Sequence, residues 1–165
     1  MCNYATPQTV ELLDRVIGAG IYDIETPVLL PTIKAFLTAE SSRPKILLAL
    51  LARIKTVVDE LTLSELCDLA RVLEAFEGQK EGMYDLIEPY ILNKAGSMTE
   101  GDLVMALHGF YNPHLSKRYE ILDVLESMLL QQIDNLSPHL VADLLDFYSD
   151  RQMGSRVLIE ALKSR

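Results

Sequence analysis

Apolar residues recur every three or four positions in blocks along the chain, and four blocks end in phenylalanine: VLLPTIKAF, DLARVLEAF, DLVMALHGF and HLVADLLDF. This spacing places the apolar side chains of each block on one face of a helix. The closing residues, Phe36, Phe76, Phe110 and Phe147, lie 40, 34 and 37 positions apart. A helical pattern that recurs at this period predicts a solenoid of helical hairpins.

Helix start signals divide each repeat into a first helix, called the A helix below, and a second one, the B helix. A hydroxyl side chain can accept a hydrogen bond from a free backbone N–H of the first turn, and a following proline or acidic residue strengthens the signal. The A helices carry these signals at Thr26 before Pro27, Thr62 with Glu65, Thr99 with Asp102, and Ser137 before Pro138.

We therefore expect one all-α domain over residues 1–165, built as a right-handed helical-hairpin repeat solenoid of about nine helices. A half-repeat helix lies within residues 6–20, and its apolar face needs a cap from a longer N-terminus or from a partner. Two prolines, Pro31 and Pro89, fall inside predicted helices and force a kink or a late start there. The predicted hairpins cover residues 26–60, 61–96, 98–134 and 136–165.

Composition agrees with a single folded domain. The chain has 165 residues, of which 49% are hydrophobic, and this is enough to bury a sizeable core. The longest apolar run, residues 46–52, is far shorter than the roughly 20 residues that span a bilayer. Neither a secretory signal nor an arginine-rich transit peptide is evident in the first residues, so an organellar location implies a processed chain.

Residues that could carry catalysis or bind a metal do not form a recognised motif. The two cysteines make no disulfide or metal pattern, and Cys67 is expected to be a small buried hydrophobe. The histidines, His108, His114 and His139, lack the spacing of a zinc site. We therefore predict no catalytic, cofactor-binding or metal-binding residues. The enzyme alternative requires a pocket that joins groups from several repeats, such as His108 with Asp143.

Charge is the more informative property. The net charge is −9, and the A helices predicted at 27–38, 62–77, 99–111 and 137–150 hold only two basic residues, Lys34 and Arg71. The same segments hold nine acidic residues: Glu65, Asp68, Glu74, Glu77, Glu100, Asp102, Asp143, Asp146 and Asp150. Nucleic-acid binding needs Lys and Arg to replace the counterions of the phosphates, so this face favours a basic protein surface instead.

Part of this acidic face is our predicted partner-binding site, together with two tyrosines that the apolar stripes do not explain. The predicted residues are Glu65, Asp68, Glu74, Asp102, Tyr111, Asp143, Asp146 and Tyr148.

The phrase LSPHLVADLLDF at residues 136–147 resembles the opening of repeats in the pentatricopeptide and octotricopeptide branch of the tetratricopeptide-like superfamily. The resemblance covers residues 24–165 and implies the hairpin fold. Most members of this branch bind organellar RNA, which the charge disfavours here. In size, repeat content and charge, the chain is also similar to the pentatricopeptide-like extra subunit of the euglenozoan mitochondrial ATP synthase, which is attached to the catalytic head through the alpha subunit.

This resemblance implies a non-catalytic accessory subunit of a large complex in the mitochondrial matrix, with the ATP synthase alpha subunit as its partner and without membrane insertion. Two alternatives stay open: an organellar RNA-binding repeat protein, and a structural subunit of a mitochondrial ribosome or RNA-processing complex.

Overall fold

The computed structural model describes residues 20–38, 44–74, 76, 81–151 and 154–165, and these ranges contain helices and no strand. The all-α class is thereby confirmed, whereas the predicted half-repeat helix at 6–20 lies almost wholly outside the described residues. The α-helices are α2 (Thr26–Thr38), α3 (Pro44–Val57), α4 (Leu63–Glu74), α5 (Glu81–Lys94), α6 (Glu100–Phe110), α7 (Ile121–Gln132), α8 (Pro138–Arg151) and α9 (Arg156–Lys163). Short 3-10 helices are η1 (Ile21–Asp23), η2 (Val58–Glu60), η3 (Ala95–Ser97) and η4 (Ile133–Asn135).

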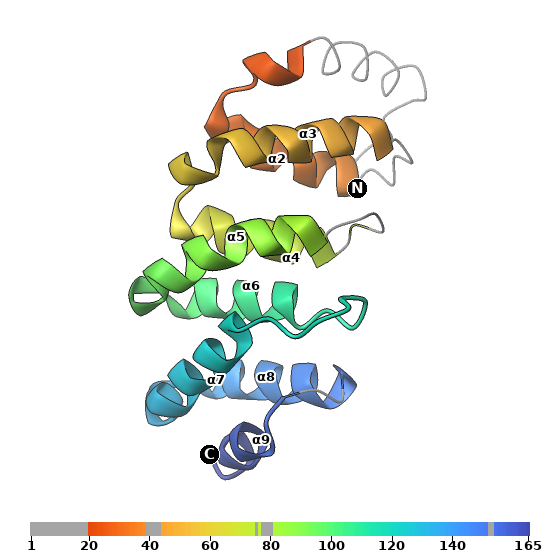
Figure 1. Cartoon of the computed structure of the whole chain (residues 1–165). Coiled ribbons are helices and arrows are strands. Elements are labelled where there is room, and N and C mark those ends of the chain that lie inside the picture. Colours follow the sequence, from red (N-terminus) through yellow and green to blue (C-terminus); the bar gives the residue numbers. More distant parts are fainter. Residues whose placement is uncertain (1–19, 39–43, 75, 77–80, 152–153) are drawn as a thin grey trace, which may run out of the picture.

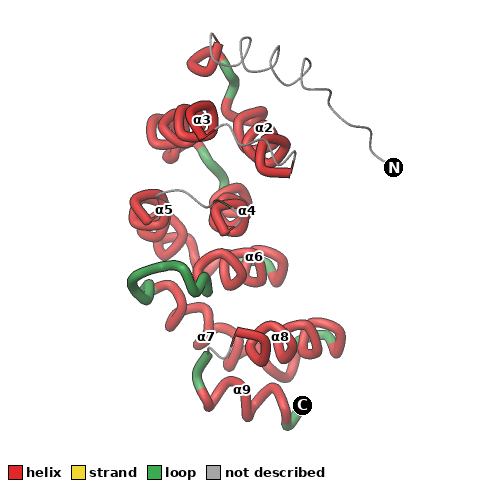
Figure 2. The backbone as a smooth tube through the Cα atoms, turned by 90° about the vertical axis from the view of Figure 1, so that its right-hand side faces the viewer, coloured by secondary structure: helices red, strands yellow, loops and turns green. Residues whose placement is uncertain are grey.

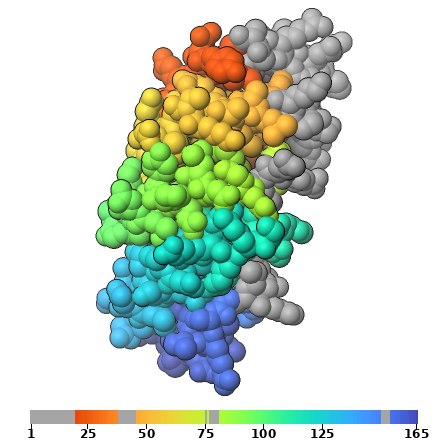
Figure 3. All heavy atoms as spheres, in the orientation of Figure 1, coloured from red at the N-terminus to blue at the C-terminus, as the bar shows by residue number. Residues whose placement is uncertain are grey.

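The helices lie in two layers. The A helices α2, α4, α6 and α8 form one layer, and the B helices α3, α5 and α7 form the other (Figure 1, Figure 2). The last B helix, α9, packs against both α7 and α8. Successive hairpins follow one another along an elongated body, so the chain runs through it in bands from one end to the other (Figure 3).

Local hydrogen bonds start three of the four A helices where the sequence predicts. The predicted cap at Thr26 is wrong, because Thr26 is already the first residue of α2 and its hydroxyl donates to the carboxylate of Glu60. The hydroxyl of Thr99 accepts a hydrogen bond from the backbone N–H of Asp102, whose carboxylate accepts one from the Thr99 N–H in return. Thr62 and Glu65 form the same reciprocal pair. Ser137 accepts a hydrogen bond from the N–H of Leu140 at 3.2 Å. These three capping signals are confirmed, and each satisfies donors that a helix start leaves free.

The later B helices receive part of their start from the preceding B helix. The N–H of Ile121, the first residue of α7, donates to the carboxylate of Glu88 in α5 at 3.0 Å. The N–H of Ser155, which caps α9, donates to the buried carboxylate of Glu126 in α7 at 3.2 Å. Neighbouring hairpins are therefore joined by hydrogen bonds as well as by apolar packing.

The structure corrects three further details of the sequence analysis. α2 and α5 begin well before Pro31 and Pro89, so a late start is wrong for both helices. Phe76 follows the end of α4, so the A helix predicted over 62–77 is too long. Counted from the capping residues Thr62, Thr99 and Ser137, the closing phenylalanines lie 14, 11 and 10 positions along and are not equivalent.

Buried positions do match when each A helix is counted from its own capping residue. Leu66, Leu103 and Val141 each lie four residues after the cap, and all three are buried. This register identifies the side chains that occupy corresponding positions in successive A helices.

Three aromatic rings pack together between the second and third hairpins. The rings of Tyr84, Phe110 and Tyr119 are buried, and their centroids lie 5.1 to 5.7 Å apart. The Tyr84 hydroxyl donates to the backbone carbonyl of Ala70 at 3.0 Å. Cys67 of α4 is buried, as predicted, and burial, with the nearby charges of Asp102 and Asp68, raises the pKa of its thiol to about 12.

α4 and α6 pack more closely than any other helix pair in the described part of the chain. A glycine makes this possible. A Cβ atom added to Gly109 of α6 would lie 2.4 Å from the backbone carbon of Ala70 in α4. Only a residue without a side chain fits at that distance, so the two helix backbones are in direct contact.

Candidate partner-binding site

α6 and α8 approach each other less closely than α4 and α6 do (Figure 2). Phe147 of α8 lies ten residues after its capping Ser137, and Gly109 of α6 lies ten residues after its capping Thr99. The two residues are therefore equivalent, and a phenyl ring stands in α8 where α6 has only a hydrogen atom. The ring keeps the backbones of α6 and α8 apart.

The C-terminal ends of α6 and α8 are filled by an aromatic cluster of His108, Tyr111, Phe147 and Tyr148. The rings of His108 and Phe147 are centred 4.2 Å apart. Tyr111 lies 6.0 Å from Phe147 and 5.5 Å from Tyr148, in edge-to-face geometry. Such pairs add to the free energy gained by burial alone, so the cluster is a firm spacer at this end of the two helices.

The N-terminal halves of the same helices leave an open groove, the A-helix groove, with a volume of about 400 Å³. Its floor is apolar, formed by Val104 and Met105 of α6 and Leu140 of α8. The other lining residues are polar or small: Arg71, Glu100, Gly101, Ser137, His139 and Asp143. An apolar floor with a charged rim suits a protein segment that inserts an apolar side chain and pairs its flanking charges.

The rim of the A-helix groove carries charges that solvent can reach. Glu100 and Asp143 are exposed carboxylates on opposite helices. The imidazole of His139 lies 3.4 Å from the Asp143 carboxylate, one helical turn away, and both side chains are largely exposed. Arg71 of α4 is an exposed cation at the same rim. The rim therefore carries two carboxylates, of Glu100 and Asp143, and the guanidinium of Arg71.

Five of the predicted partner-binding residues have side chains that are exposed or half-buried. Asp143 and Asp146 are exposed on α8, and Asp143 lines the A-helix groove. Glu65 is engaged in capping α4, and Asp68 forms an ion pair with Lys34 of α2. Glu74 is half-buried near the end of α4. The acidic character of the face therefore rests on fewer carboxylates than the sequence count indicated.

The other three predicted residues are buried, and the prediction that a partner touches them is corrected here. Tyr111 and Tyr148 belong to the aromatic cluster, with 0% and 2% of their surface exposed. Asp102 is 3% exposed, and its carboxylate caps α6 and accepts a hydrogen bond from Ser64 of α4. Burial acts against ionisation of this carboxyl group, but the hydrogen bonds from Ser64 and Thr99 outweigh it and hold the pKa of Asp102 below its usual value.

The sequence analysis did not place Glu100, Val104, Met105 and Leu140 in the binding site. The register counted from the capping residues is the signal that could have found this groove. In that register Gly101 of α6 corresponds to Ser64 of α4, and Leu140 of α8 corresponds to Asp102 of α6. In the α4–α6 contact, Ser64 hydrogen-bonds Asp102. The equivalent pair across α6 and α8 is Gly101 and Leu140, and both line the groove instead.

Within the ranges that the structure describes, no group of three or more metal-ligating side chains comes together. The same ranges contain no helix long and apolar enough to cross a membrane. In comparisons with known proteins, no protein-family model, no curated protein and no solved structure matches this chain.

Proposed function

We propose that this chain is a non-catalytic helical-repeat scaffold, a right-handed solenoid of the pentatricopeptide-like kind, which holds a protein partner on its A-helix face. The observation that carries the proposal is the A-helix groove, an apolar slot between α6 and α8 with ionisable side chains at its rim. A partner segment would place an apolar side chain on Met105 and Leu140 and basic groups beside Glu100 and Asp143.

The two-layer arrangement supports the scaffold part of the proposal. Each hairpin packs mainly against its neighbours in the chain, as solenoid units do, and the A helices lie side by side in one layer (Figure 2). Such a layer offers an extended surface on which a partner can lie. The aromatic cluster supports the binding part, because it keeps the groove open without help from a ligand.

The resemblance to an extra subunit of the mitochondrial ATP synthase names the first partner to test, the alpha subunit of its catalytic head. We propose that the chain works in the mitochondrial matrix as an accessory subunit of that complex. The alternative large assemblies, mitochondrial ribosomes and RNA-processing complexes, are tested by the same experiment.

The test is affinity purification of the tagged chain from mitochondria of cells that make it, followed by mass spectrometry. We expect the alpha subunit in stoichiometric amount. Double reversal of the groove charges, Glu100→Lys with Asp143→Lys, should lower the recovery at least about tenfold. The matched control, Glu120→Lys with Asp134→Lys, changes two exposed carboxylates outside the groove and should recover the partner normally.

RNA binding is the alternative function, and a separate binding measurement tests it. A fluorescein-labelled single-stranded RNA added to the purified chain should show no change in anisotropy even at low salt, because exposed cations on the A-helix face are few. Tight, salt-sensitive binding of the RNA, with no protein recovered at stoichiometry, would overturn the scaffold proposal.

A further inference from the structure

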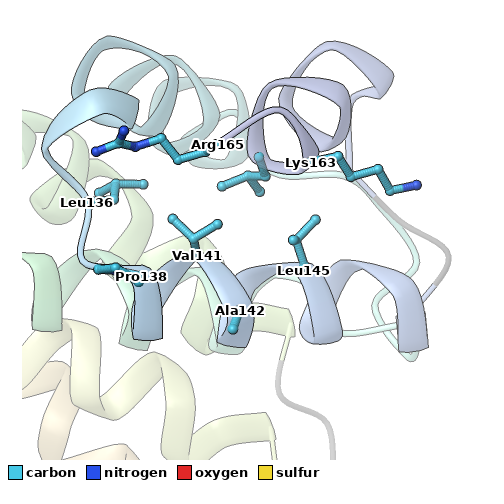
Figure 4. A pocket seen from close by; sticks show the side chains of 8 residues that line it. Leu136, Pro138, Val141, Ala142, Leu145, Lys163 and Arg165 are labelled. Carbon is cyan, nitrogen blue, oxygen red and sulfur yellow. The ribbon is translucent and has the colours of Figure 1, made fainter.

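A second groove, the end groove, lies between α8 and α9 and is distinct from the A-helix groove. Figure 4 shows Val141 and Leu145 of α8 pointing into it, with Leu136 and Pro138 at one end. Its volume is about 380 Å³, and Ala142 and Leu162 complete the apolar lining. Contact of these apolar side chains with water is unfavourable, so covering them with another apolar surface lowers the free energy.

The side chains in the end groove occupy positions that face the following A helix elsewhere in the chain. Leu145 lies eight residues after its capping Ser137, as Ala70 lies eight residues after Thr62, and Ala70 receives α6 through Gly109. Ala142 lies five residues after its cap, as Val104 does in α6, where it lines the groove toward α8. The end groove therefore presents the face of an A helix that elsewhere receives another helix.

The rim of the end groove is basic, although the whole chain is acidic. Two basic residues, Lys163 and Arg165, line the groove, and its lining holds no acidic side chain. Arg165 lies across the groove near Leu136, where its guanidinium donates to the backbone carbonyl of Asp134 (Figure 4). Lys163 lies at the opposite end of the groove (Figure 4). Two cations beside an apolar slot complement a helix with acidic residues beside its apolar face.

We propose that the end groove binds an amphipathic helix of a partner protein, with apolar residues against Val141 and Leu145 and acidic residues against Lys163 and Arg165. The helix lies across α8 as α6 lies across α4. This site is independent of the A-helix groove and has the opposite charge preference, so either proposal can fail without the other.

The test uses the full-length chain and a fluorescein-labelled synthetic helix of about 18 residues, which is about five turns. One face of the peptide is leucine-rich with a central alanine, and glutamates flank that face. A second peptide carries lysine in place of each glutamate. The net charge of −9 acts against the acidic peptide as a whole, so a preference for it requires local contact with the basic rim.

We expect the acidic peptide to bind at least about tenfold more tightly than the basic one. Lys163→Glu should remove this preference, whereas Lys55→Glu, an equal charge change at an exposed position of α3, should leave it unchanged. Ala142→Glu should weaken binding at least about tenfold, and Ala35→Glu, at an exposed position of α2, should not. All four positions are solvent-exposed, so the variants are expected to fold.

Equal affinities for the two peptides would overturn the proposal. The same preference for the acidic peptide in Lys163→Glu and Lys55→Glu would overturn it as well. Self-association of the chain in sedimentation velocity that Ala142→Glu abolishes would also overturn it, since a second copy would then be the occupant. The variant with Glu100→Lys and Asp143→Lys should bind the acidic peptide as the parent chain does, and a gain in affinity of at least about tenfold would assign the peptide to the A-helix groove instead.

Discussion

The contact between α4 and α6 and the contact between α6 and α8 join equivalent helices at nearly equal spacing in the sequence, yet one is closed and the other is open. In the first, Gly109 meets the backbone of Ala70, and Ser64 hydrogen-bonds Asp102. In the second, Phe147 and Leu140 take the places of that glycine and that aspartate. Similar spacing along the sequence therefore does not give similar contacts between helices, and the bulk of Phe147 at the position where α6 has Gly109 accounts for part of the difference.

The largest effect is expected from removing the spacer of the open contact. Phe147→Ala deletes a buried ring that contacts His108, Tyr111 and Tyr148, and it should lower the free energy of unfolding by about 3–5 kcal/mol. Urea unfolding followed by circular dichroism measures this loss. Val157→Ala, at a position 64% exposed, is the control and should change stability by no more than about 0.5 kcal/mol. A loss below about 1 kcal/mol for Phe147→Ala would contradict the spacer role.

The closed contact should fail when its glycine gains a side chain. Gly109→Ala forces α4 and α6 apart, because the new methyl group overlaps the Ala70 backbone, and it should cost about 2–3 kcal/mol. Gly101→Ala is a matched control in the same helix, since its nearest neighbour would be the Thr99 hydroxyl at 3.7 Å. The control should be neutral or stabilise the chain by up to about 1 kcal/mol. Similar unfolding midpoints for the two variants would show that the close approach does not matter.

Capping should matter more at the closed contact than at the open one. Thr99→Ala removes the cap of α6 and a hydrogen bond to buried Asp102, so a loss near 2 kcal/mol is expected. Ser137→Ala removes the single cap bond at the exposed start of α8 and should cost about 1 kcal/mol. Thermal unfolding of both variants tests the order, and a larger loss for Ser137→Ala would reverse the comparison.

The smallest effect at neutral pH, and the most specific, concerns Asp102. Its folded-state pKa is lowered, so its stabilising contribution is complete above its unfolded pKa of about 4 and disappears as the pH falls through the folded value. Asp102→Asn lacks this group, so its stability should decline less steeply than that of the parent chain below about pH 4. Denaturant unfolding at a series of pH values from about 6 to 2 measures both slopes. Parallel slopes would mean that the hydrogen bonds from Ser64 and Thr99 do not lower the pKa of Asp102 in solution.

The sequence predicted the local features well. Capping boxes and helix starts depend on residues three or four positions apart, so Thr62, Thr99 and Ser137 could be recognised without knowing the fold. The burial of Asp102 could not be predicted from the sequence, because its hydrogen-bond partner Ser64 belongs to another helix. Tyr111 and Tyr148 were misplaced for the same reason, since their rings contact each other between segments that are distant in the sequence. The A-helix groove depends on Phe147, which holds α6 and α8 apart. No pattern of neighbouring residues in the sequence predicts this effect.

The glutamates that start the B helices have a consequence for how the chain folds. α7 depends on Glu88 of α5, and the cap of α9 depends on Glu126 of α7, so neither helix start is complete in an isolated hairpin. Order in one unit is thereby passed to the next as a free-energy coupling between nearest neighbours. Unfolding should consequently spread along the array cooperatively, and a hairpin excised from it should melt at a lower temperature than the same residues do within the whole chain.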